Sequence, residues 1–281
     1  MSWTCSRQEW IFRHARVCLD GGAKVDQIKL LAVGNSFSED ALYYFHDICE
    51  TAGITCKAVN LYIGGCSLQQ HCENIASGKN VYEYQLNGNF EGQMVSVQDA
   101  LAEDAWDYIL IQQASHDSGI WETYEPWLAE LAVHIREGCP KAELLLHKTW
   151  AYEQDSSHDA FVRYHNSQME MYQKLTFCYG RAAEQVRVRL IPSADVIQEV
   201  RQREGFCYGH GEQSLCRDGY HMHMIYGRYL LGALFYMFLT GRDIRANAFC
   251  PEGAETKKIE TIKQGIVTVL LQDGSEYRRR V

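Results

Sequence analysis

The stretch IKLLAVGNSFSED, residues 28–40, decides the fold, because a buried strand passes directly into a helix there. Ile28 to Val33 is an apolar run, interrupted only by Lys29, with the length of a strand covered on both faces. A helical segment over 39–52 follows, with acidic residues in its first turn and Gly53 behind its last. Between the two lies the turn GNSFS, residues 34–38. This order is typical of a parallel sheet whose strands are joined by helices.

The same unit repeats along the chain. Further strands are expected over 54–63, 108–112, 142–147 and 186–191, and further helices over 125–137 and 159–183. Residues 82–97, with an Asn-Gly turn at 87–88, predict a small β-hairpin inserted outside the main sheet. The pattern predicts an α/β fold, a three-layer α/β/α sandwich around a central five-stranded parallel sheet. In such folds the ligand site lies beyond the carboxyl ends of the strands.

The domain organisation follows from what interrupts this pattern. The sequence has no internal repeat and no Pro/Gly/Ser-rich linker, which predicts a single domain over 1–281 with its core at about 28–240. A helical extension is expected over 8–19, and helices over 225–240 and 255–271 should follow the core. The first 22 residues carry charges and no apolar run, so neither a signal peptide nor a membrane anchor is expected.

The composition of the chain indicates its cellular compartment and the class of molecule that it binds. The eleven cysteines are an odd number without a CxxC pair, which favours a reducing cytoplasm over a disulfide framework. The formal net charge of -9 disfavours nucleic acid and anionic membranes, because both attract basic surfaces. A small neutral or weakly charged molecule is therefore the expected partner.

Ser36 is the first candidate for chemistry, because it lies on the tight turn between the first strand and its helix. Backbone N–H groups at a helix start point toward negative charge that develops on an attacked carbonyl. Ser36 and Ser38 are also typical helix-capping residues, and for Ser36 alone capping is the better interpretation.

A second candidate pair is Asp218 and His221, three residues apart in DGYH. The Asp carboxylate can fold back onto one imidazole nitrogen and leave the other nitrogen to face a serine. Taken alone, Asp218 fits a turn with the following glycine, and His221 fits an ordinary surface or capping histidine.

Three separated blocks together resemble the SGNH (GDSL-like) hydrolases, over about residues 28–240. The blocks are GNSFS at 34–38, IGGCS at 63–67 and Asp218-x-x-His221, and the resemblance points to a poorly characterised branch of that superfamily. It implies a flavodoxin-like SGNH fold and no cofactor. It also implies that Ser36 is the nucleophile, His221 the base and Asp218 the residue that orients the base.

The glycine block resembles the family's donor to the oxyanion hole, the group of donors that binds the negatively charged oxygen. A carbonyl oxygen approaches a backbone N–H closely only where side chains are absent, so Gly65 is the candidate donor beside the Ser36 N–H. Without the serine block, the better interpretation of Gly64-Gly65 would be a turn that ends a strand.

The third block departs from the family pattern. Many members carry Gly-x-Asn-Asp where this chain has QQASHD at 112–117. A Gln amide can donate to an oxyanion as an Asn amide does, so Gln113 is the predicted third donor. Gln112 is the alternative donor, and it is also a predicted substrate contact. Because side chains alternate along a strand, the two glutamines should face opposite ways, so only one of them should reach the site.

Residues that follow the third and fourth strands complete the predicted site. His116, Trp150 and Tyr152 are expected to contact substrate, since aromatic faces suit stacking on a sugar. Aromatic residues of such loops also pack into the interior at least as often, so this assignment stays open.

The predicted function is hydrolysis of a small acyl ester through a serine acyl-enzyme. The resemblance implies acyl esters, and the Gln-type block favours an acetyl group on a carbohydrate. A lipid esterase, a thioesterase and an acyltransferase share the covalent step, and a non-catalytic carbohydrate-binding domain is the alternative from another class. A zinc site remains a lesser alternative, since its candidate ligands fit no known closed zinc spacing. These candidates are Cys207, His210, Cys216, His221 and His223.

Overall fold

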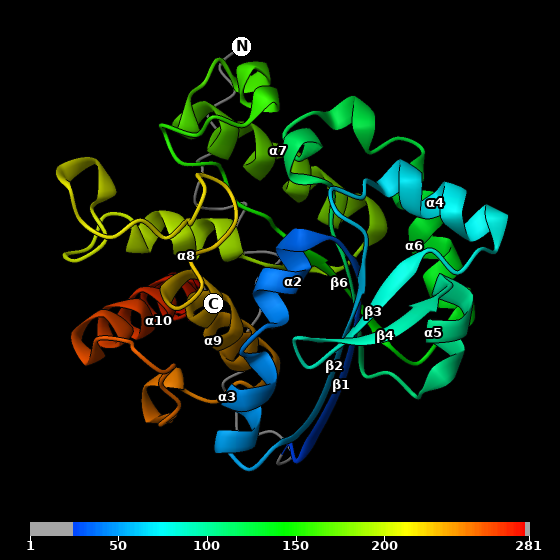
Figure 1. The fold of residues 1–281 in the computed structure, drawn as a ribbon, viewed down its shortest axis with the longest axis horizontal. Helices are drawn as coiled ribbons and strands as arrows, with labels where there is room; N and C mark the ends of the chain where they lie inside the picture. Colours follow the sequence, from blue (N-terminus) through cyan, green and yellow to red (C-terminus); the bar gives the residue numbers. More distant parts are fainter. Residues whose placement is uncertain (1–24, 279–281) are drawn as a thin grey trace.

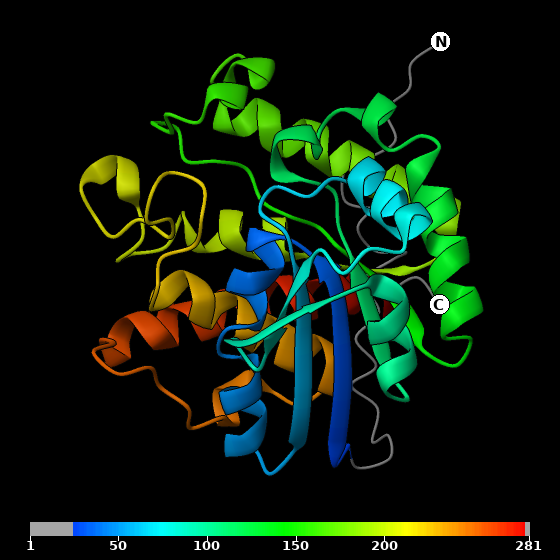
Figure 2. The same cartoon turned by 45° about the vertical axis from the view of Figure 1, so that its right-hand side comes forward.

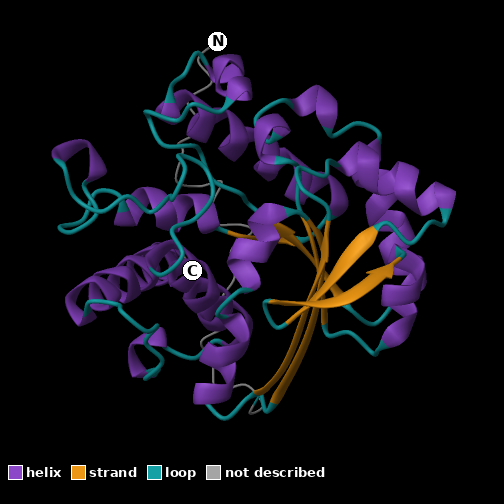
Figure 3. Ribbon diagram, viewed as in Figure 1, coloured by secondary structure: helices purple, strands orange, loops and turns teal. Residues whose placement is uncertain are grey.

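The computed structural model describes residues 25–278 and contains one seven-stranded mixed sheet, shown in Figures 1 and 3. Its strand order is β4-β3-β2-β1-β5-β6-β7. The strands are β1 (Gln27–Gly34), β2 (Thr55–Tyr62), β3 (Tyr82–Leu86), β4 (Asn89–Val95), β5 (Tyr108–Ile111), β6 (Glu143–His147) and β7 (Arg189–Ile191). β2, β1, β5, β6 and β7 pair in parallel, whereas β3 pairs antiparallel with β2 and with β4.

Helices cover both faces of this sheet, as the apolar character of its strands requires. They are α2 (Ser36–Leu42), α3 (Phe45–Thr51), α4 (Leu68–Ser77), α5 (Val97–Glu103), α6 (Trp127–Gly138), α7 (Gln168–Val186), α8 (Ser193–Val200), α9 (Tyr226–Thr240) and α10 (Thr256–Arg278). α2, α3, α8, α9 and α10 pack together on one side, and α4 to α7 pack together on the other (Figures 1 and 2). Short 3-10 turns lie at Ser115–Asp117, Trp121–Thr123, Asp159–Tyr164, Tyr208–His210 and Ile244–Ala246.

α9 is the most deeply buried of the helices. All its residues from Tyr226 to Leu239 are buried, because α2, α3 and α10 pack against it. A helix that is apolar all round belongs inside a larger structure or a membrane. Within residues 25–278, no helix has both the length and the apolarity needed to cross a bilayer.

The predicted sheet was too small. The hairpin of β3 and β4 exists, but it does not lie outside the main sheet as expected, because β3 pairs with β2 from Val59↔Leu86 to Tyr62↔Glu83. The Asn87-Gly88 turn signal predicts a hairpin but not the strand that it joins. By pairing there, the hairpin satisfies the backbone groups on that edge of β2.

Several helix boundaries also differ from expectation. The segment predicted as one helix over 39–52 is α2 followed by α3, and it begins earlier, at Ser36, because Asn35 caps it. The predicted helix over 159–183 begins as a 3-10 turn, and α7 begins only after its capping residue Ser167. α4, α5 and α8 were not predicted, since each is shorter than the roughly 11 residues over which a helical period is judged. The helix expected over 8–19 lies outside the described residues.

Candidate active site

Ser36 begins α2 at the carboxyl end of β1, but it does not cap the helix. The Asn35 side chain accepts from the Phe37 N–H at 3.0 Å, and Ser38 Oγ accepts from the Asn35 N–H at 2.9 Å. These two residues form the capping box. A Cβ on Gly34 would lie 1.9 Å from Ser38 Oγ, so the turn requires glycine there. Capping is therefore complete without the half-buried Ser36 hydroxyl.

The structure brings Ser36, His221 and Asp218 together. Ser36 Oγ lies 3.0 Å from His221 Nε2, and His221 Nδ1 lies 2.7 Å from Asp218 Oδ2. Asp218 Oδ1 accepts from the backbone N–H groups of His221 at 2.7 Å and Tyr220 at 3.2 Å. Burial of the carboxyl opposes its ionisation, but the His221 imidazole and these N–H groups outweigh that effect and lower the pKa of Asp218.

Asp40 lies one turn after Ser36 on α2 and is fully buried. Its carboxylate accepts from the Met222 N–H at 2.8 Å and from Arg217 Nη1 at 2.9 and 3.0 Å. It also accepts from Arg228 Nε of α9 at 2.7 Å. Arg217 further donates to the Met222 carbonyl. One carboxylate on the serine's helix thus contacts the chain on both sides of Asp218 and His221.

The glycine block lies in a turn beside the serine. Ile63 O accepts from the Cys66 N–H at 3.2 Å, and Gly65 within this turn has φ +65, a conformation that L side chains rarely adopt. Asn35 Nδ2 donates to Cys66 O at 3.0 Å. The residue that caps α2 therefore also fixes the exposed Gly65 turn near Ser36.

The two glutamines face opposite ways, as expected, but Gln113 has no donor to spare. Its Nε2 donates to Thr123 O at 2.9 Å and Thr123 Oγ1 at 3.1 Å, and its Oε1 accepts from the Leu68 and Ala114 N–H groups. Its contacts therefore do not support the predicted oxyanion role. Gln112 lies beside the serine turn instead, donating to Asn35 Oδ1 at 2.7 Å while its Oε1 is 2.8 Å from His147 Nδ1.

Two of the residues predicted to bind substrate are fully buried. Trp150 stacks on Phe37 with ring centroids 4.0 Å apart, and its Nε1 donates to Tyr220 O at 2.7 Å. The Tyr152 hydroxyl is 2.8 Å from Ser115 Oγ, and burial raises the pKa of Tyr152. Neither ring offers a face to a ligand, so that prediction was wrong for both residues. Gln112, also predicted there, is 1% exposed.

The Tyr220 ring lies beside His221 and the His158 ring lies beside Tyr220, and the sequence had indicated neither residue. The Tyr220 ring lies 4.2 Å from that of His221 and 4.7 Å from that of His158. Burial lowers the pKa of His158, and nearby His116 lowers it further. His116, which was predicted to bind substrate, is partly exposed, 6.5 Å from the His158 ring. The sequence could have indicated Tyr220 as a site residue, since it is next to His221 in the chain. His158 lies in a loop without a motif, so no signal in the sequence indicated it.

The candidate zinc ligands have other contacts. His223 Nδ1 accepts from the backbone N–H groups of Ile225 and Tyr226, and Cys216 Sγ accepts from Arg201. Across the described part of the chain, no group of three or more His, Cys, Asp or Glu side chains is arranged to hold a metal ion.

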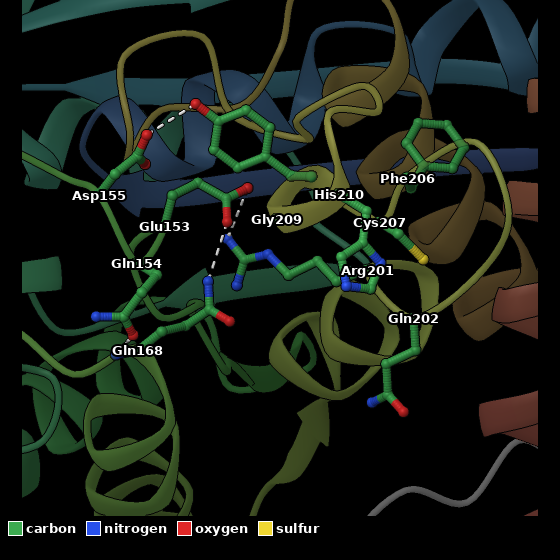
Figure 4. Close-up of a pocket in the computed structure, with 11 residues that line it drawn as sticks. Glu153, Gln154, Asp155, Gln168, Arg201, Gln202, Phe206, Cys207, Gly209 and His210 are labelled. Atoms are coloured by element: carbon green, nitrogen blue, oxygen red, sulfur yellow. Dashed lines mark hydrogen bonds and ion pairs between the residues drawn. The ribbon is translucent and has the colours of Figure 1, made fainter.

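A cavity of about 800 Å³ is lined by the chain that follows β6, the start of α7 and the segment that follows α8 (Figure 4). Its lining includes Glu153, Gln154, Asp155, Gln168, Arg201 and Tyr208. The buried Glu153 accepts from Gln168 Nε2 at 3.0 Å and lies 3.3 Å from Arg201 Nη2. The Glu153 N–H donates to Gly219 O at 2.7 Å. One wall of the cavity is therefore bonded to the turn between Asp218 and His221.

Comparison with known proteins agrees with this architecture. A family profile described as a domain of unknown function (DUF4886) matches residues 29–268. A DUF4886 family protein from Bacteroides uniformis is 36% identical, with a TM-score of 0.81, 88% of this chain covered and 96% of that one. No match was found among curated protein sequences.

More distant solved structures share the fold. A protein from Slackia heliotrinireducens, proposed to be an SGNH hydrolase, is 20% identical with a TM-score of 0.51, covering 77% of this chain and 100% of that one. A variant of the acetyl-xylooligosaccharide esterase Axe2 from Geobacillus stearothermophilus is 13% identical with a TM-score of 0.51, covering 79% and 98%. These structural neighbours include SGNH and GDSL-like hydrolases, so the chain has the fold that the resemblance implied.

Proposed function

Because this chain belongs to the DUF4886 family and has the fold of SGNH hydrolases, we propose that it is a serine esterase that cleaves a small acyl ester. One observation carries the proposal: Ser36 Oγ, His221 and Asp218 lie in one hydrogen-bonded series, with contacts of 3.0 and 2.7 Å. These residue types in this order are those of a nucleophile, a base and the group that orients the base.

In the proposed reaction, Ser36 Oγ attacks the ester carbonyl while His221 Nε2 takes the hydroxyl proton. The tetrahedral intermediate collapses when His221 returns that proton to the leaving alcohol, which gives an acyl-enzyme on Ser36. A water molecule then attacks the acyl group by the same steps and releases the acid. Asp218 keeps the proton on His221 Nδ1 and stabilises the imidazolium, so that Nε2 can accept.

For the oxyanion we propose the backbone N–H groups of Ser36 and Gly65. Ser36 is the first residue of α2, where an N–H has no partner within the helix. Gly65 is exposed, and its turn is bonded to Asn35. Each such donor is worth about 3 kcal/mol in the transition state. Gln112 would act indirectly, by holding Asn35.

For the substrate we propose an acetyl ester of a carbohydrate. Two observations support this choice: one structural neighbour is an acetyl-xylooligosaccharide esterase, and the cavity beside the catalytic loop presents amides and carboxylates. Such groups both donate to and accept from sugar hydroxyls. Tyr208, at 39% exposure, adds an aromatic side chain. Sugar units next to the ester would bind in this cavity.

We expect Tyr208→Ala to raise the KM for an acetylated xylo-oligosaccharide about fivefold, because an aromatic contact is lost. The KM for 4-nitrophenyl acetate, which has no sugar unit to bind in the cavity, should not change. Steady-state kinetics with both esters measures this. Phe177→Ala is the matched control, since Phe177 is a 65% exposed aromatic residue of α7 that does not line the cavity. An equal KM for the oligosaccharide in all three proteins would contradict the assignment of the cavity.

The alternative is a carbohydrate-binding domain without catalysis, and one simple labelling experiment distinguishes it from the esterase. A fluorophosphonate probe reacts with a serine only if a neighbouring base activates it. Labelling of Ser36 in the folded protein supports the esterase. An oligosaccharide that binds while Ser36 stays unlabelled would favour the alternative. A panel of acyl esters, thioesters and acyl acceptors then separates the esterase from a lipid esterase, a thioesterase and an acyltransferase.

A further inference from the structure

The loop that carries Asp218 and His221 is poorly buried, so its position depends on a few anchors. The side chain of Asp218 is 40% exposed and that of His221 is 21% exposed. Trp150 Nε1 donates a hydrogen bond to the Tyr220 carbonyl, and the Glu153 N–H donates one to the Gly219 carbonyl. Both of these anchors come from the chain that follows β6. Neither forms a hydrogen bond to the serine's own helix, although Trp150 also stacks on Phe37 of α2.

A third anchor comes from that helix. Asp40, four residues after Ser36, is fully buried and is bonded to Arg217 and to the Met222 N–H. Arg217 immediately precedes Asp218, and Met222 immediately follows His221. Since Ser36 and Asp40 belong to one short helix, this contact fixes the loop relative to the serine.

We propose that Asp40 and Arg217 are positioning residues that hold His221 Nε2 within reach of Ser36 Oγ. The inference rests on the proposed esterase function. Neither residue touches the reacting atoms, and both act through the loop between them. Arg217 suits this role because its Nη1 contacts both Asp40 oxygens and the Met222 carbonyl at once. A lysine supplies a point charge without the planar guanidinium.

The choice of variant follows from the burial of each partner. Removal of Asp40 would leave Arg228 buried and unpaired, since its side chain is only 7% exposed, and the protein could fail to fold. Arg217 is 28% exposed, and without it Asp40 still pairs with Arg228. Arg217→Met therefore removes the side-chain part of the anchor, keeps the bond from the Met222 N–H to Asp40, and leaves no buried charge unpaired.

The matched control is Arg189→Met. Arg189 pairs with Glu143 at 2.6 Å, and both residues lie at the starts of their strands, away from the carboxyl ends where Ser36 lies. The control thus removes an arginine that is as exposed as Arg217, at 28%, without touching the loop. Thermal unfolding of every variant shows that it is folded before activity is compared.

We expect Arg217→Met to lower kcat for 4-nitrophenyl acetate about 100-fold and to slow fluorophosphonate labelling of Ser36 equally, because small displacements of a reacting group cost about that much. The KM should stay within about threefold, since the acyl site is intact. Arg217→Lys should give intermediate rates, and Arg189→Met should match the wild type. A folded Arg217→Met protein with wild-type kcat and labelling would overturn the proposal.

The NMR signals of the His221 ring separate failure of this inference from failure of the esterase assignment. If the wild type neither reacts with the probe nor cleaves any ester, the esterase function is wrong. The position of the ring is then still measurable. Ring chemical shifts that change in Arg217→Met but not in Arg189→Met support the positioning role, and shifts identical to the wild type in both variants overturn it.

Discussion

Ser36→Ala is expected to lower kcat/KM for ester hydrolysis on the order of 10⁶-fold, the scale on which a serine hydrolase loses activity without its nucleophile. Thermal stability should hardly change. α2 is capped by Asn35 and Ser38, and the contact between His221 and Asp218 does not involve Ser36. Initial rates with 4-nitrophenyl acetate and the melting temperature measure the two effects.

Ser96→Ala is the control, because we expect it to lower thermal stability and leave activity unchanged, the reverse of Ser36→Ala. Ser96 caps α5 through the Asp99 N–H, away from the serine turn, so its loss should cost about 1 kcal/mol of stability. Its activity should equal that of the wild type. If Ser36→Ala instead destabilised the protein and kept its activity, Ser36 would be a structural residue and the proposed mechanism would be wrong.

Asp218→Asn is expected to lower kcat about 10³- to 10⁴-fold by reversing the tautomer of His221. Asp218 Oδ1 accepts from two backbone N–H groups, so an asparagine would keep its carbonyl oxygen there. Its NH2 group would then replace Oδ2, 2.7 Å from His221 Nδ1. An amide donor in that place requires an unprotonated Nδ1, so the ring proton would move to Nε2. His221 could then no longer accept the proton of Ser36.

The control for this substitution is Asp243→Asn. Asp243 also accepts a backbone N–H, that of Arg245 at 2.9 Å, and pairs with the Arg245 side chain, but it lies in the turn after α9. Its activity should not change. Steady-state rates and the ¹⁵N chemical shifts of the His221 ring measure the effect. An Asp218→Asn enzyme that keeps kcat within about tenfold of wild type and Nδ1–H on His221 would contradict the assigned role.

The sequence could predict those site residues whose place follows from their position directly after a strand or close to one another in the chain. Ser36, Gly65 and Gln112 each follow a parallel strand, and the carboxyl ends of such strands meet at one edge of the sheet. Asp218 and His221 are close in sequence, so a local turn suffices to join their side chains. These placements require only strand positions and short-range geometry.

The rest of the site depends on packing that the sequence does not show. Gln113 carries the right amide, but Thr123, ten residues later, takes both of its hydrogens. Trp150 was predicted to stack on a sugar, but the Phe37 ring stacks on the Trp150 ring instead. Asp40 fitted a favourable acid in the first turn of a helix, whereas its partners lie more than 170 residues away. Each error concerns a side chain whose partner is fixed by tertiary structure.

The central claim is that Ser36 carries the acyl group during turnover. The most direct test is intact-mass and peptide mass spectrometry of protein quenched within milliseconds of mixing with excess 4-nitrophenyl acetate. We expect a mass increase of one acetyl group, located on the peptide that contains Ser36 and absent from Ser36→Ala. Ester turnover with no acetyl group on that peptide, or with the acetyl group on another residue, would contradict it.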